Sequence, residues 1–63
     1  MIQLTLPTMT CNHCVRTVTA TVQAVDPQAT LQINLPQHTV EITSTQPAQT
    51  FTAALAEAGY AAA

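Results

Sequence analysis

The chain contains one pair of cysteines, Cys11 and Cys14, separated by two residues in the run Cys11-Asn12-His13-Cys14. Two thiols at this spacing can bind one soft metal ion together, or they can close on each other as a disulfide. The chain offers no second cluster of reactive side chains, because it has only one basic and three acidic residues. We therefore expect any function beyond folding to involve this pair and the surface around it.

The segments on either side of the cysteine pair differ in their hydrophobic period. Residues 2–6 alternate between apolar and polar side chains, which predicts a strand with one buried face. Pro7 ends this strand and begins a loop that carries Cys11. A helix is then predicted from Asn12, its expected N-cap, to Asp26-Pro27. Its apolar face is a valine stripe made of Val15, Val18, Val22 and Val25.

This reading places Cys14 in the first turn of the helix and Cys11 in the loop before it. Unpaired backbone N–H groups and the helix dipole favour negative charge at a helix N-terminus. We therefore expect the thiol pKa to be lowered, most of all for Cys14. The thiolate that results is the form that binds metal.

The second half of the chain predicts a hairpin, a helix and a short strand. Strands at residues 29–35 and 39–43 flank a turn at residues 36–38. A helix follows, with Pro47 in its first turn and Gly59 as its C-terminal cap, and residues 60–63 form a short last strand. The apolar stripe of this helix comprises Phe51, Ala54, Leu55 and Ala58.

The order βαββαβ predicts an α+β fold in a single domain, residues 1–63. Right-handed crossovers give a split βαβ sandwich, in which a four-stranded antiparallel sheet carries both helices on one face. The loop after the first strand and the loop before the last strand then lie at the same end of the sheet. Tyr60 should therefore be a neighbour of Cys11 and Cys14.

Composition excludes several functions. A single basic residue cannot neutralise a row of phosphates or hold an anionic membrane surface, so we expect neither nucleic acid nor a membrane as partner. No apolar run approaches the roughly 20 residues of a membrane span, and the N-terminus does not resemble a signal peptide. We therefore expect a cytoplasmic protein, in which a close cysteine pair indicates metal binding or redox exchange and not a structural disulfide.

The donor set favours copper over zinc. Two soft thiolates without an obvious third ligand suit Cu(I), which accepts low coordination numbers, whereas structural zinc is bound by four ligands. The two histidines are the remaining candidate ligands. We expect His13 to be a solvated loop residue. We expect His38 to be a surface residue of the hairpin turn, away from the cysteine loop or at its margin.

The residues around the pair carry a resemblance to a known family. The run Met9-Thr10-Cys11-Asn12-His13-Cys14, followed by Val15, resembles the Met-Thr-Cys-x-x-Cys motif of the heavy-metal-associated domain. The resemblance continues through the element order to Gly59-Tyr60 and covers the whole chain. It implies a ferredoxin-like open-faced sandwich and a soluble Cu(I) metallochaperone, not an enzyme. Such chaperones deliver copper to the metal-binding domains of copper-transporting P-type ATPases.

The resemblance also implies roles for individual residues. Cys11 and Cys14 are the metal ligands, Met9 packs beneath the metal loop, and Tyr60 lies near the metal. Zinc-type relatives carry Asp immediately before the first cysteine, where this chain has Thr10. Met9 and Tyr60 are thus candidates for an auxiliary role around the ion, and His13, which is not a fixed feature of the family, is a further candidate.

Two other functions remain open from the sequence. The cysteine pair could belong to a thiol–disulfide redox protein. The chain could also be a mercury-binding, other soft-metal-binding or regulatory domain of the same family. For the copper carrier, we further expect a copper-bridged homodimer when no other thiol is present. Two thiolates leave Cu(I) coordinatively unsaturated, and the sparse charge offers little repulsion between copies.

Overall fold

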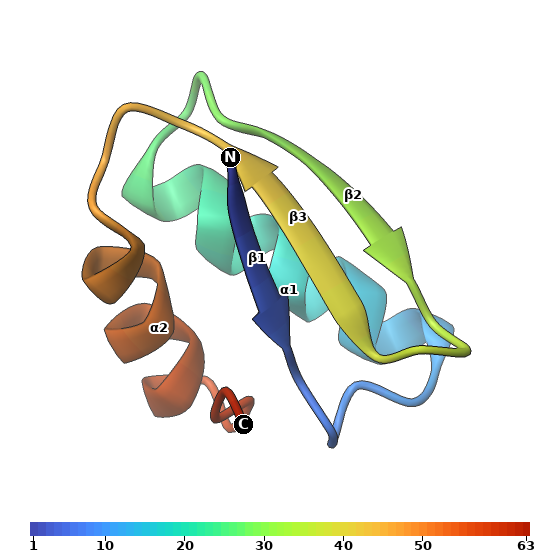
Figure 1. Ribbon diagram of the computed structural model, residues 1–63. Coiled ribbons are helices and arrows are strands. Elements are labelled where there is room, and N and C mark those ends of the chain that lie inside the picture. The colour runs from blue at the N-terminus through green and yellow to red at the C-terminus, as the bar shows by residue number, and fades with distance from the viewer.

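The computed structural model describes the whole chain, residues 1–63, as one sheet covered on one side by two helices (Figure 1). The elements follow in the order β1 (Ile2–Thr5), α1 (Asn12–Val25), β2 (Thr30–Asn34), β3 (Thr39–Thr43) and α2 (Ala48–Glu57). The prediction of an α+β fold with both helices on one face is confirmed. Neither helix is both long and apolar enough to cross a membrane.

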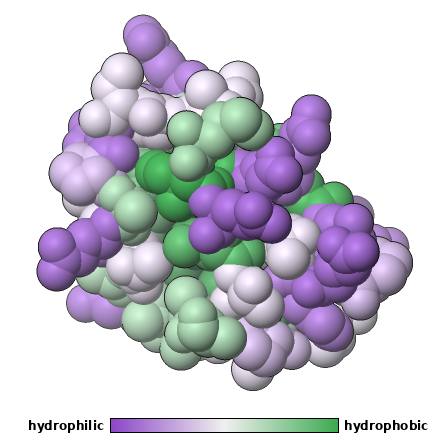
Figure 2. Space-filling view, in the orientation of Figure 1, coloured by the Kyte–Doolittle hydropathy of each residue, from purple (hydrophilic) through white to green (hydrophobic).

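The sheet has the order β1-β3-β2, with both pairings antiparallel and β3 in the centre. Alternation along the strands gives it two different faces. On the inner face, Ile42 of β3 lies opposite Ile2 and Leu31. On the outer face, Glu41 lies opposite Gln3 and Gln32. Figure 2 shows hydrophilic groups spread over this outer face, with hydrophobic atoms visible between them.

The predicted fourth strand is absent, and the sheet has three strands. The tail after Tyr60 makes one backbone hydrogen bond to the sheet, from the Ala63 N–H to the Thr5 carbonyl at 2.8 Å. Because the Leu6 N–H points toward β3, the Thr5 carbonyl faces the unpaired edge of β1. One hydrogen bond does not make a ladder, and alanine is a poor strand former. The four-stranded prediction is therefore corrected to three strands with a tail against the edge.

The core lies between the inner face of the sheet and the two helices. The valine stripe faces it as predicted, with Val18 and Val22 fully buried. From α2, Phe51 and Leu55 are fully buried, whereas Ala58 is exposed and only caps the helix. The buried set is Leu6, Met9, Val18, Val22, Ala29, Val40, Ile42, Phe51 and Leu55.

Candidate metal centre

The start of α1 differs by one residue from the prediction. Cys11 is the N-cap, with an extended backbone (φ −146°, ψ 171°), and its carbonyl accepts the Val15 N–H at 3.1 Å. Asn12 is therefore the first helical residue and not the cap. No side chain caps this helix end, so its first N–H groups have no side-chain partners.

The two thiols converge at this end of α1. The Cys11 and Cys14 Sγ atoms are 3.2 Å apart, and both cysteines are free. Cys11 is exposed, whereas Cys14 is half-buried and packs against the core. The Cys14 thiol also donates to the Thr8 carbonyl, with sulfur and oxygen 3.8 Å apart. The fold thus presents two sulfurs together, one fixed on a helix and the other at the end of a loop.

The C-terminal end of α2 brings Tyr60 to the same place. Gly59 adopts a positive φ of 96°, and its N–H bonds to the Ala56 carbonyl at 3.1 Å. The Tyr60 N–H reaches back to the Leu55 carbonyl at 2.8 Å. These two bonds form a Schellman motif, which reverses the chain and packs the residue after the glycine on the core. Tyr60 is accordingly half-buried against the core cluster.

The loops after β1 and after α2 meet, as the predicted topology requires. The Thr8 hydroxyl donates to the Gly59 carbonyl at 3.4 Å. The Tyr60 hydroxyl in turn interacts with the Cys14 thiol. The prediction that Cys11, Cys14 and Tyr60 are neighbours is therefore confirmed.

This neighbourhood changes the acidity of Cys14. Its pKa falls from 9.0 to about 6, chiefly because the Tyr60 hydroxyl stabilises the thiolate by a hydrogen bond, with smaller contributions from the Thr10 backbone and the Cys11 side chain. The same hydrogen bond raises the pKa of Tyr60, since ionised tyrosine could no longer donate it. The expected lowering of the Cys14 pKa is present, but its largest cause is a side chain and not the helix terminus.

The other sequence candidates do not gather around the thiols. Met9 is fully buried in the core, which agrees with packing beneath the loop. His13 is exposed as expected, but it lies in the first turn of α1 and not in the loop. No group of three or more His, Cys, Asp or Glu side chains comes together as a metal site. The centre therefore consists of two sulfurs, with Tyr60 beside them.

The structure places His38 at the margin of the cysteine loop, one of the two expected positions, but not as a surface residue. It is half-buried, and its Nδ1 lies 2.9 Å from the Met9 carbonyl oxygen, so it braces the cysteine loop from the hairpin turn. The pairing of β1 with β3 could have revealed this, because it continues to a hydrogen bond between Leu6 and His38 at the edge of the loop.

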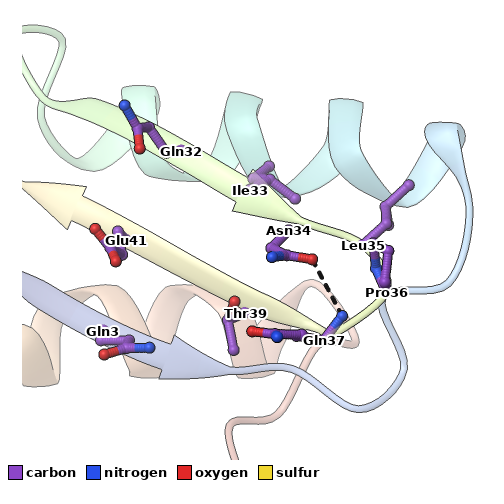
Figure 3. Close-up of a pocket in the computed structure, with 9 residues that line it drawn as sticks. All are labelled: Gln3, Gln32, Ile33, Asn34, Leu35, Pro36, Gln37, Thr39 and Glu41. Carbon is purple, nitrogen blue, oxygen red and sulfur yellow. Dashed lines mark hydrogen bonds between the residues drawn. The ribbon is translucent and has the colours of Figure 1, made fainter.

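The largest hollow on the surface lies elsewhere, on the outer face of the sheet (Figure 3). It measures about 400 Å³ and contains neither cysteine. Glu41 is its only charged residue, and the Asn34 side chain in it accepts the Gln37 N–H at 3.2 Å. Its lining consists of Gln3, Gln32, Ile33, Asn34, Leu35, Pro36, Gln37, Thr39 and Glu41. We do not assign chemistry to it, because a bare ion bound by two thiolates needs no pocket of this size.

Comparison with known proteins agrees with this geometry. The family model of the heavy-metal-associated domain matches residues 3–61. A search of curated protein sequences found no match. Among solved structures, a trimeric form of a point mutant of the copper chaperone Atx1 from Synechocystis PCC6803 is 43% identical, with all of both chains covered and a TM-score of 0.96.

Two further structures extend the comparison. The solution structure of the cyanobacterial copper metallochaperone ScAtx1 is 42% identical, with 98% of this chain and 97% of that chain covered and a TM-score of 0.80. A gold binding protein is 29% identical, with 98% of this chain and 95% of that chain covered and a TM-score of 0.94. The names of these relatives associate this architecture with soft metals.

Proposed function

The chain belongs to the heavy-metal-associated domain family, and we propose that it is a cytoplasmic Cu(I) metallochaperone that binds copper through Cys11 and Cys14. Copper chaperones of this family traffic metal and are not enzymes, which disfavours the thiol–disulfide alternative. The observation that carries the proposal is the pair of free sulfurs 3.2 Å apart, one of which has a pKa of about 6. At neutral pH this arrangement supplies a thiolate without the help of a metal.

The composition of the site supports Cu(I) as the cargo. Soft thiolates favour soft ions, and Cu(I) is satisfied by few donors. Zinc would need further ligands, and no carboxylate or imidazole joins the two sulfurs. Thr10, directly before Cys11, has no carboxylate oxygen to offer a harder ion. Two other soft ions, mercury and gold, remain competitors for the same site.

Transfer would proceed by exchange of thiolate ligands. A thiolate of the partner adds to two-coordinate copper, the ion passes through a three-coordinate bridge, and one donor sulfur of this chain then leaves. Cys11 is suited to leave first, because it is exposed and held by a loop, whereas Cys14 is half-buried on α1. No electron is transferred, and the departing sulfur can take up a proton from water.

We propose the metal-binding domains of a copper-transporting P-type ATPase as the partner. Arg16 is the only basic side chain of the chain, so docking relies mainly on polar and apolar contacts and gives a weak, transient interface. A copper-bridged homodimer would use the same exposed end of the molecule. The trimeric form of the Synechocystis chaperone shows that a relative can self-associate.

The proposal is tested by anaerobic copper loading. The wild type should compete with a Cu(I) chelator at a stoichiometry of one ion per chain, and each of Cys11→Ser and Cys14→Ser should lose at least about tenfold in affinity. Thr52→Val, which removes a hydroxyl on α2, is the matched control and should bind like the wild type. Sedimentation of the loaded protein without added thiol reports on bridging. A double serine variant that still competes like the wild type would refute the assignment.

A further inference from the structure

His38 has an unusual backbone conformation. It is the only residue other than glycine with a positive φ, at 58°. This left-handed region is unfavourable for residues with a Cβ, although histidine enters it more often than most. Such a conformation persists only where the surroundings impose it, and it often marks a functional constraint. The contacts of His38 show what imposes it here.

The backbone of His38 is held from two sides. Its N–H donates to the Leu35 carbonyl at 3.1 Å, which closes the hairpin turn. Its carbonyl accepts the Leu6 N–H at 2.7 Å, which extends the β1–β3 pairing toward the loop. The turn therefore fixes the backbone of His38, and its side chain extends toward the cysteine loop.

The imidazole makes one long-range hydrogen bond. Its Nδ1 lies 2.9 Å from the Met9 carbonyl oxygen, between residues 29 positions apart in the chain. A carbonyl oxygen only accepts, so Nδ1 must carry the proton and donate. The ring is half-buried, which limits competition from water. This bond joins the hairpin turn directly to the loop that leads to Cys11.

Met9 is thereby fixed at three points. Its side chain is fully buried, its N–H donates to the Leu6 carbonyl at 3.0 Å, and its carbonyl accepts from His38. Only Thr10 separates it from Cys11. Cys14 lies within the helix, whereas Cys11 stands at the boundary, with its carbonyl bonded to α1 and its N-terminal side joined to the loop. The loop anchor at Met9 therefore fixes the segment through which the chain enters Cys11.

We propose that His38 is a positioning residue of the metal centre: its Nδ1–H fixes the Met9 carbonyl and so holds the Cys11 sulfur within reach of Cys14. The inference rests on the proposed function only in assigning copper as the ion. The preorganisation of the two sulfurs is a property of the metal-free chain and can be measured without any metal.

The first measurement uses the reduced wild-type protein without metal. Long-range proton–nitrogen correlation spectra of the imidazole rings distinguish the two neutral tautomers of His38. The proposal requires the tautomer protonated at Nδ1, with a proton that exchanges slowly with water. A neutral His38 ring protonated mainly at Nε2 would overturn the proposal, whether or not the protein binds copper.

The second measurement compares His38→Gly with Gln37→Ala. Glycine removes the ring but accepts a positive φ, so the turn should keep its backbone, and Gln37→Ala changes an exposed side chain of the same turn. With glutathione as redox buffer, the effective concentration of the two thiols toward each other should fall about three- to tenfold in His38→Gly, as expected for one lost hydrogen bond. Cu(I) affinity should fall by about tenfold, while Gln37→Ala changes neither.

The outcomes separate this inference from the proposed function. A His38→Gly protein with wild-type effective concentration would overturn the positioning role even if copper binds. If the wild type does not bind copper, but the effective concentration of the two thiols falls as expected in His38→Gly, the proposed function is refuted and the positioning role is retained. If His38→Gly does not fold, His38→Asn, which also tolerates a positive φ, takes its place. Loss of folding in both variants would show that His38 serves the fold, which also overturns the proposal.

Discussion

The contact between Tyr60 and Cys14 makes a sharp prediction for the variant Tyr60→Phe. The substitution removes the hydroxyl that contributes most to the low pKa of Cys14 and keeps the ring that packs against the core. The backbone of residues 59 and 60, held by the Schellman motif, does not depend on the hydroxyl. We therefore expect a change in acidity without a change in fold.

The size of the change follows from the causes of the shift. The pKa of Cys14 falls from 9.0 to about 6, and four hydrogen bonds share this lowering, of which the bond from Tyr60 is the largest. Its loss should return at least a quarter of the lowering, which raises the pKa of the variant by about 0.75 or more. At pH 7 the thiolate fraction of Cys14 should then fall from about 90% to about two thirds or less. Above pH 9 the two proteins should behave alike.

The assay is the alkylation rate of Cys14 as a function of pH, followed by mass spectrometry. The comparison is made between Cys11→Ser and Cys11→Ser/Tyr60→Phe, so that only one thiol reacts and both proteins lack the Cys11 contact. Cys11→Ser/Thr52→Val is the control, since it loses a hydroxyl that donates on α2. If the midpoint moves by less than about 0.3 on removal of the Tyr60 hydroxyl, the assigned cause of the pKa shift is wrong.

Two further predictions concern stability. The reduced, metal-free protein should unfold cooperatively, and its melting temperature should rise between pH 6 and pH 9. The pKa of Cys14 in the folded protein lies below its ordinary value of 9.0, so its thiolate stabilises the fold fully above pH 9, and this stabilisation is lost as pH falls through about 6. Cys14→Ser should remove the rise in melting temperature. A Cys14→Ser variant that keeps the pH profile of the wild type would contradict this linkage. Gly59→Ala should lower the free energy of unfolding by about 1 kcal/mol in a denaturant titration, because alanine is strained at the φ of 96°. A steric clash does not contribute, since no atom lies within 4 Å of the added Cβ. An unchanged free energy of unfolding would contradict this reasoning and show that the turn relaxes.

Most of the fold could be predicted because two hydrophobic periods alternate cleanly along the chain. The valine stripe has helical spacing, and residues 30–34 and 39–43 alternate, so the sequence determines which faces become the core. The meeting of Cys14 and Tyr60 followed from topology alone. The fourth strand was wrongly predicted because the order of the elements suggests one at the C-terminus. A strand requires a ladder of hydrogen bonds to its neighbour, and residues 61–63 do not form one.

The parts of the site that were missed depend on backbone detail. Asn12 is a preferred N-cap type, yet the extended backbone of Cys11 already provides the first helical acceptor. The dominant effect of Tyr60 on Cys14 depends on where one hydroxyl points, which a sequence pattern does not encode. The role of His38 requires both the register of β1 on β3 and a positive φ in the turn. The last two features depend on contacts between residues that lie far apart in the chain.

The spacing of the sulfurs leads to a last prediction about the copper-loaded state. If each Cu–S bond resembles the about 2.3 Å of a zinc–thiolate bond, two opposed sulfurs stand about 4.6 Å apart, whereas Cys11 and Cys14 are 3.2 Å apart. Cys14 is fixed on α1, so Cys11 must move, and the anchored Met9 limits that movement to Thr10 and Cys11 itself. We therefore expect a bent two-sulfur site that accepts a third thiolate readily. X-ray absorption of the loaded protein should show a third sulfur donor on addition of glutathione, less readily in His38→Gly, where the loop can open. A linear two-sulfur site in the wild type that ignores added thiol would refute this reasoning.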